Sequence, residues 1–109
     1  MKKDDKSLGK IIAIIKRINP QEVYLFGSHA NGSFDEQSNI DLLIIAPSID
    51  RPSERRMKLR KELSEFDRSI GLDLLVYTPD EYKILVNEPS SFLFSAIKQG
   101  IKIYDHENP

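Results

Sequence analysis

The run Leu42-Leu43-Ile44-Ile45 constrains the fold of this chain more than any other feature. Successive side chains of a strand point to opposite faces of a sheet, so a strand that is apolar on both sides must be covered on both sides. The run lies within the segment NIDLLIIA, from Asn39 to Ala46, which we predict to be a strand. The sequence therefore predicts a central strand with helices packed on both faces of its sheet.

Three further segments have strand character. EVYLF (Glu22 to Phe26) and LDLLVY (Leu72 to Tyr77) are rich in apolar, β-branched and aromatic side chains, and Gly or Pro residues lie close to their ends. IKIY (Ile101 to Tyr104) is short and leaves two alternatives open, an edge strand or an extended tail. The sheet therefore has three or four predicted strands.

Two longer helices are predicted beside these strands. We expect Ser7 to cap the first, whose apolar residues from Leu8 to Ile18 recur at helical spacing until Asn19-Pro20 ends it. Residues 1–6 are expected to be a frayed, charged end. Ser53 is expected to cap the second helix, over about residues 54–69, and its buried side chains are expected to be Met57, Leu59, Leu63, Phe66 and Ile70.

Two shorter helices are predicted near the C-terminus. Thr78-Pro79-Asp80-Glu81 is typical of a helix start, with an N-cap Thr, Pro at the first helical position and acids in the first turn. After an interruption at Asn87-Glu88-Pro89, Ser90 is expected to cap a last helix that ends before Gly100. We expect core packing, rather than a partner surface, for most of the nearby aromatic residues: Tyr82, Phe92, Phe94 and Tyr104.

The order of these elements limits the topology. The short connection between the first two strands favours an antiparallel or mixed pairing, whereas the long helix before the third strand favours a crossover to a parallel neighbour. We therefore predict an α/β (α+β) fold, a small mixed β-sheet of three to four strands packed with helices. At 109 residues, the chain is expected to form a single domain over residues 1–109.

Composition excludes several classes of protein. The net charge is -1, so no basic excess points to nucleic acid as the main partner. Cysteine is absent, which excludes disulfides and thiolate metal sites. No apolar run approaches the roughly 20 residues of a membrane span, and the N-terminus MKKDDKSLGK is unlike a signal peptide. The simplest expectation is a cytoplasmic protein without a membrane partner, and the oligomeric state is left open.

The dipeptide Gly27-Ser28 follows the first predicted strand and precedes a predicted helical turn. Glycine lets a ligand approach the backbone closely, while a serine hydroxyl and the free N–H groups of a helix start suit a phosphate. An ordinary tight turn with a helix cap would contain the same residues. This dipeptide alone therefore leaves both alternatives open.

Asn39 and Asp41 project to the same side of the second predicted strand, since they are two residues apart. Asp73 lies near the start of the third strand, among apolar residues, and would face Asp41 if the two strands are neighbours. Carboxylates held together in this way suit a divalent cation such as Mg²⁺. The alternative is that Asn39 closes an Asx turn and that both acids are polar strand ends facing water.

Taken together, GSHANGSFDEQSNIDLLIIA resembles the signature of nucleotidyltransferases of the DNA polymerase β superfamily. The resemblance is closest to the minimal nucleotidyltransferase (MNT) proteins that pair with HEPN proteins. In that family a Gly-Ser follows the first strand, another glycine follows, a Ser-Asp-x-Asp-Leu run opens the second strand, and a third acid lies on a later strand. The matching positions are Gly27, Ser28, Gly32, Ser38, Asp41, Leu42 and Asp73.

The resemblance implies an activity and a set of ligands. The triphosphate of ATP, or of another nucleoside triphosphate, would be bound by Gly27, Ser28, Gly32 and Ser38. Two Mg²⁺ ions would be held by the residues at the three metal positions, Asn39, Asp41 and Asp73, of which Asp41 and Asp73 would be the catalytic pair. A nucleoside monophosphate would pass to a protein hydroxyl, such as a tyrosine of a HEPN toxin, which would make this chain an antitoxin.

One residue departs from the family pattern. The first acid of the Asp-x-Asp pair is Asn39 here, so the expected metal site has one formal negative charge fewer. We expect this amide to weaken the second metal first and to lower the activity, because Mg²⁺ gives up its waters reluctantly. The alternative function is a catalytically degraded module that acts by binding a nucleotide or a partner alone.

Overall fold

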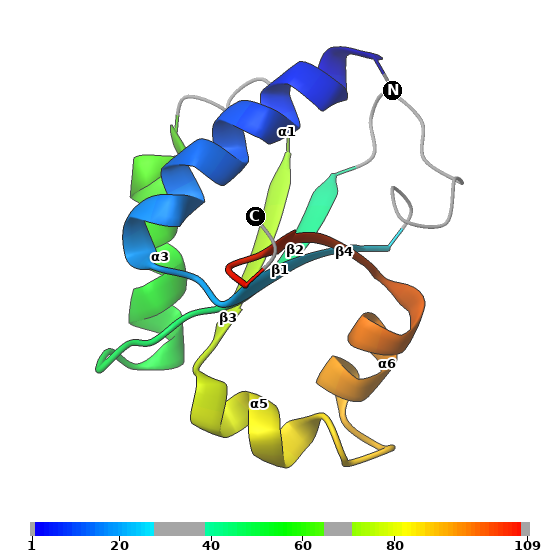
Figure 1. The fold of residues 1–109 in the computed structure, drawn as a ribbon. Coiled ribbons are helices and arrows are strands. Elements are labelled where there is room, and N and C mark those ends of the chain that lie inside the picture. Colours follow the sequence, from blue (N-terminus) through cyan, green and yellow to red (C-terminus); the bar gives the residue numbers. More distant parts are fainter. Residues whose placement is uncertain (1, 28–38, 65–70, 108–109) are drawn as a thin grey trace.

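A four-stranded mixed sheet, in the order β3-β2-β1-β4, forms the middle of this computed structural model (Figure 1). The structure describes residues 2–27, 39–64 and 71–107, and side chains from residue 8 onward. The strands are β1 (Glu22–Phe26), β2 (Ile40–Ile45), β3 (Leu72–Tyr77) and β4 (Ile101–Asp105). The C-terminal segment is therefore an edge strand, which resolves the alternative that the sequence left open.

The strand directions agree with the connections. β1 pairs antiparallel with β2, β2 pairs parallel with β3, and β1 pairs antiparallel with β4. The long helical connection between β2 and β3 makes the parallel crossover that the sequence favours. The predicted α/β fold with a small mixed sheet is confirmed.

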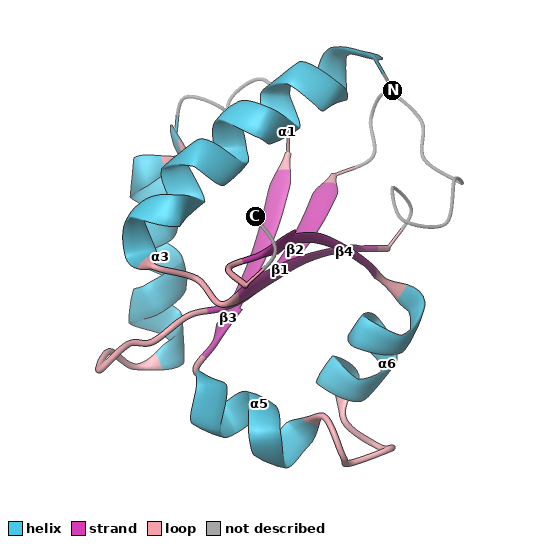
Figure 2. Ribbon diagram, viewed as in Figure 1, coloured by secondary structure: helices cyan, strands magenta, loops and turns pink. Residues whose placement is uncertain are grey.

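Helices cover the sheet on both faces (Figure 2). α1 (Lys2–Ile15), which continues into the short 3-10 helix η1 (Lys16–Ile18), and α3 (Pro52–Glu62) lie on one face, and α5 (Pro79–Leu85) and α6 (Phe92–Gln99) lie on the other. Along β2, Ile40, Leu42 and Ile44 are buried toward the α1 side, and Leu43 and Ile45 toward the α6 side. The prediction of a central strand that is covered on both faces is confirmed. No helix in the described ranges is both long and apolar enough to cross a membrane.

Helix starts differ from the sequence predictions in three places. α1 begins at Lys2, so Ser7 lies inside the helix rather than at its cap, and residues 2–6 are helical rather than frayed. α3 begins at Pro52 after Arg51, not at Ser53, because the fixed φ of proline suits the first helical position. The cap of α6 is Ser91, whose hydroxyl accepts a hydrogen bond from Phe94 N at 3.0 Å. The predicted capping box at Thr78 and Glu81 is confirmed.

The expected buried side of α3 is only partly correct. Leu59 and Leu63 are buried, but Met57 is 56% exposed. α3 covers only one edge of the sheet, beside β3, so a narrow stripe of the helix meets the core. Phe66 and Ile70 lie outside the described residues.

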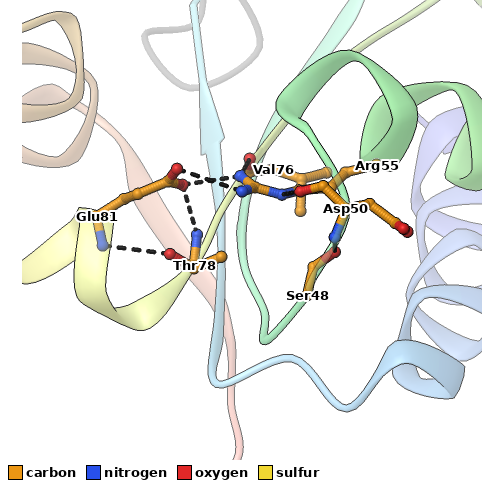
Figure 3. Close-up of polar contacts among 6 residues, drawn as sticks. All are labelled: Ser48, Asp50, Arg55, Val76, Thr78 and Glu81. Atoms are coloured by element: carbon orange, nitrogen blue, oxygen red, sulfur yellow. Dashed lines mark hydrogen bonds and ion pairs between the residues drawn. The ribbon is translucent and has the colours of Figure 1, made fainter.

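The side chain of Arg55 joins α3, β3 and α5 at one end of the sheet (Figure 3). The side chain is only 8% exposed and donates to the carboxylate of Glu81 at 2.8 Å and to Val76 O at 3.2 Å. It also donates to Asp50 O at 2.9 Å. The hydrogen bond from Arg55 lowers the pKa of the Glu81 carboxyl below its ordinary value, although partial burial opposes this shift. These contacts hold the end of β3 and the segment that follows β2, at the opposite end of these strands from Asp41 and Asp73.

Candidate functional site

Asp41 and Asp73 are brought together by the parallel pairing of β2 and β3. Their Cα atoms are partners in the register of this pairing. Asp41 lies two residues before Leu43, and Asp73 lies four residues before Tyr77, so both project to the face covered by α5 and α6. Asp73 is exposed and Asp41 is partly exposed. The structure thus confirms that the third strand lies beside the second, an arrangement that a joint metal site requires.

Gly27, directly after β1, lies against the carboxylate of Asp41. Its φ of 73° is in the left-handed region of backbone conformation, which residues other than glycine rarely adopt. A Cβ atom at this position would overlap Asp41 Oδ2. Since Phe26 is the register partner of Asp41, the end of β1 meets the start of β2 at this carboxylate. Any residue other than glycine would displace the acid.

Asn39 forms a direct hydrogen bond with the second acid. Its side-chain Nδ2 donates to Asp73 Oδ2 at 3.1 Å. The amide therefore occupies the same cluster as the two carboxylates, as the sequence pattern predicted. It holds Asp73 by hydrogen bonding, in a place where a third carboxylate would repel it.

Gly71, directly before β3, belongs to the same cluster, although its contact with Asn39 could not be recognised from the sequence. A Cβ atom at Gly71 would overlap Asn39 Oδ1. Ile40 N donates to Gly71 O at 2.8 Å, which extends the pairing of β2 with β3 back to these positions. The register of β2 and β3 could have identified this contact, because Asn39 lies opposite Gly71 when Asp41 lies opposite Asp73.

The remaining predicted nucleotide-binding residues, Ser28, Gly32 and Ser38, lie outside the described residues. Their assignment to phosphate binding therefore stays a prediction. Of the predicted site, the structure places Gly27, Asn39, Asp41 and Asp73 at one end of the sheet.

The donor set at this end of the sheet fits one divalent cation. The two carboxylates of Asp41 and Asp73 offer hard anionic oxygen, the ligand that Mg²⁺ prefers. Within the described ranges, no group of three or more His, Cys, Asp or Glu side chains could hold a metal. Asn39 directs its amide nitrogen, a donor, toward Asp73. Of the described residues, the cluster thus offers two carboxylates and one amide to a divalent cation.

Two aromatic rings lie on the same face of the sheet, beside the site. Phe26 and Phe92 meet edge to face with centroids 5.5 Å apart and an interplanar angle of 75°. Phe92, in the first turn of α6, is 53% exposed and is an exception to the core packing expected for most of these aromatic residues. Since Phe26 is the register partner of Asp41, an aromatic surface adjoins the carboxylates.

Comparison with known proteins gives a consistent result. Residues 9–108 match the family described as polymerase beta, nucleotidyltransferase. A Methanocaldococcus jannaschii protein named "Putative protein adenylyltransferase MJ0141" is 31% identical over 98 residues, which cover 90% of this chain and 93% of that protein.

Two solved structures have a similar fold. A crystal structure of a toxin–antitoxin with AMP-PNP has a TM-score of 0.63 at 24% identity. A variant of the toxin–antitoxin MntA–HpeT with two aspartate-to-glutamate substitutions has a TM-score of 0.59 at 22% identity. Each similarity covers 89% of this chain and 72% of the other. With its family match across residues 9–108, this chain belongs to the polymerase beta nucleotidyltransferase family.

Proposed function

We propose that this chain transfers AMP from ATP to a hydroxyl group of a protein. The observation that carries the proposal is the cluster of Asp41, Asp73 and Gly27, in which two carboxylates share a register position beside a glycine whose missing Cβ leaves room for the Asp41 carboxylate. Membership of the nucleotidyltransferase family supports the reaction class. The relative named as a protein adenylyltransferase supports AMP as the group and protein as the acceptor.

Gly27, Asp41 and Asp73 would each have a separate role in this reaction. Gly27 lets the triphosphate approach the end of β1, while Asp41 and Asp73 would hold Mg²⁺. When bound, Mg²⁺ would neutralise the charge of the triphosphate and of the pyrophosphate that leaves. Asp73 would accept the proton of the attacking hydroxyl. The hydroxyl oxygen forms a bond to the α-phosphorus as the bond from that phosphorus to the oxygen bridging to the β-phosphate breaks, and pyrophosphate departs.

Asn39 would lower the rate of this reaction. Its hydrogen bond occupies one oxygen of Asp73, at 3.1 Å, and it adds no negative charge for a second cation. In-line transfer to phosphorus depends mainly on positioning and charge neutralisation, so a site with one charge fewer should turn over slowly while still binding nucleotide. We therefore propose one firmly held Mg²⁺ and a second that is weak or absent.

The acceptor would be a tyrosine on a partner toxin of the HEPN class, and this chain would act as its antitoxin in the cytoplasm. The solved structures of similar fold are toxin–antitoxin complexes, one of them with AMP-PNP. Asp73 is exposed and Asp41 is partly exposed, which suits an acceptor that arrives from another protein. Transfer of AMP to a toxin would add a charged group to its surface and block its function.

The test compares labels at the two ends of ATP. The chain would be incubated with MgCl₂, a lysate of the source cells, and ATP labelled at either the α- or the γ-phosphate. We expect a protein band that keeps the α label and not the γ label, and that is lost with EDTA, Asp41→Asn or Asp73→Asn. Glu88→Gln, which removes an exposed carboxylate from the segment between α5 and α6, is the matched control and should keep the activity. Retention of the γ label would instead indicate a kinase, and labelling that survives Asp41→Asn would exclude this site.

A second candidate function rests on Asn39 alone. If the missing charge abolishes turnover, the chain is a module that binds ATP or the partner without transfer. In that case, calorimetry would detect ATP binding by the parent chain, and labelling would appear only in the Asn39→Asp variant. Labelling by the parent chain would exclude this alternative.

A further inference from the structure

In the described part of the chain, β4 forms an edge of the sheet, and one side of its backbone pairs with no other strand. Among the described residues, its backbone hydrogen bonds run to β1, and His106 N continues them to Gln21 O at 3.0 Å. In Figure 2, α1 lies on one side of the sheet and α6 on the other, and β4 is seen between them. The unpaired N–H and C=O groups of an edge strand can pair with another strand.

The side chains of β4 have an unusual pattern. The register with β1 shifts between Val23 and Tyr24, which pair with Tyr104 and Lys102, so Ile103 is the extra residue of a β-bulge. Ile103 and Tyr104 consequently both pack on the core on the α1 side. Without the bulge, residues three apart would point to opposite faces of the sheet.

Lys102 and Asp105 therefore lie together on the α6 side. Lys102 Nζ is 3.2 Å from Asp105 Oδ2 and 3.0 Å from Glu22 Oε2. Lys102 Nζ also lies 5.8 Å from the centroid of the Tyr24 ring on that face. From residue 102 to residue 105, the strand presents a cation, two apolar side chains and an anion.

This pattern is complementary to itself when the strand is reversed. We propose that a second copy of this chain pairs antiparallel with β4, about a two-fold axis between residues 103 and 104. Lys102 of each copy then lies opposite Asp105 of the other, and Ile103 opposite Tyr104. A two-fold axis perpendicular to the sheet keeps each pair on one face, so the charged pairs lie on the α6 side and the apolar pairs on the α1 side.

Other registers lose this match. A slip of one residue places Lys102 opposite Tyr104 of the second copy, and these side chains point to opposite faces. Opposite charges across paired strands favour a register, and like charges disfavour it. Since β4 has only five residues, the dimer should be reversible and dependent on concentration.

Charge exchange tests both the partner and the register. Sedimentation velocity over a range of concentrations would compare the parent chain, Lys102→Glu, Asp105→Lys and an equimolar mixture of the two variants. We expect the parent chain to dimerise, and each variant to dimerise at least about tenfold more weakly because like charges would face each other twice. The mixture should recover dimers, since a cation again faces an anion in both pairs. Lys83→Glu, an exposed change on α5, is the control and should behave as the parent chain does.

Three results would overturn the proposal: a parent chain that remains monomeric at every concentration, single variants that dimerise like the parent, or a mixture that fails to recover dimers. A measurement on the parent chain alone covers the case in which a variant does not fold. Hydrogen exchange should show protection of the amides of residues 101–105 that rises with protein concentration. Protection independent of concentration would equally contradict the pairing.

Discussion

Replacing Asn39 by aspartate should make the stability of this chain depend on Mg²⁺. At present Asn39 Nδ2 donates to Asp73 Oδ2 at 3.1 Å, and Asp41 lies in register with Asp73 on the neighbouring strand. The Asn39→Asp variant loses this hydrogen bond and puts a third negative charge beside two others. Without a cation, the cluster therefore changes from a bonded arrangement to a repulsive one.

The magnitude follows from these contacts. Loss of the hydrogen bond should cost about 1 kcal/mol. Two like charges about 4 Å apart repel by about 1 kcal/mol in water and by about 4 kcal/mol at an effective dielectric constant near 20. Because Asn39 and Asp73 are both exposed, the repulsion should lie near the lower figure. The variant should therefore be less stable by about 2–3 kcal/mol in EDTA, which corresponds to a melting temperature lower by about 10 °C.

Mg²⁺ should reverse this loss in the variant and have a smaller effect on the parent chain. Binding at a hundredfold excess over the dissociation constant contributes about 2.7 kcal/mol. Thermal unfolding followed by circular dichroism, with EDTA or increasing MgCl₂, measures both quantities. Asn87→Asp is a matched control, because Asn87 is also exposed and donates a single hydrogen bond, to Lys83 O at 3.3 Å, away from Asp41 and Asp73. Equal melting temperatures of the Asn39→Asp variant and the parent chain in EDTA, or equal responses to Mg²⁺, would refute the reasoning.

Three further predictions concern single residues. Gly27→Ala should lower stability by about 1–3 kcal/mol and weaken ATP binding measured by calorimetry, because φ is 73° and the new Cβ would displace Asp41. Gly9→Ala, whose new Cβ would meet nothing within 4 Å inside α1, should keep ATP binding and raise stability slightly, because alanine favours a helix more than glycine does. Arg55→Met should cost about 2–3 kcal/mol in urea unfolding, since it leaves Glu81 without its main partner. Because the folded-state pKa of Glu81 is lowered, the contribution of this ion pair to the free energy of unfolding is complete above the ordinary pKa of 4.5 and is lost as the pH falls through the folded-state pKa. The parent chain should therefore lose more stability than the Arg55→Met variant in that pH range. Parallel pH profiles of the two proteins would contradict this role of Arg55. Ser91→Ala should cost about 1 kcal/mol through loss of the α6 cap, whereas Ser90→Ala should have little effect.

Much of the fold could be predicted from local sequence. The run Leu42 to Ile45 required cover on both faces, and the strand segments and their order specified the sheet. Helix starts were less accurate, because serine at position 7 or 53 resembles a cap but the chain is already helical there. Met57 was misassigned because helical spacing shows which residues share a side of a helix, not how wide a part of that side is covered.

The site was predictable in its acids but not in its contacts. Asp41 and Asp73 could be named from their places at strand starts, and their proximity followed once β2 and β3 were taken to be neighbours. The bond from Asn39 to Asp73 and the closeness of Gly71 depend on register between segments more than 30 residues apart, which no local pattern contains. Phe92 likewise joined the surroundings of the site only through the packing of α6 on β1.

The position of Arg55 has a consequence for how this family member can change. Its ion pair with Glu81 and its bonds to Val76 O and Asp50 O secure the end of β3 and the segment after β2, remote from Asp41 and Asp73 (Figure 3). The Arg55 contacts and the candidate site thus lie toward opposite ends of the sheet. On the function proposed above, a metal ligand at position 39 could be exchanged for an amide without loss of these contacts, so a protein of this architecture could lose turnover and survive as a binding partner, or regain turnover by a single substitution.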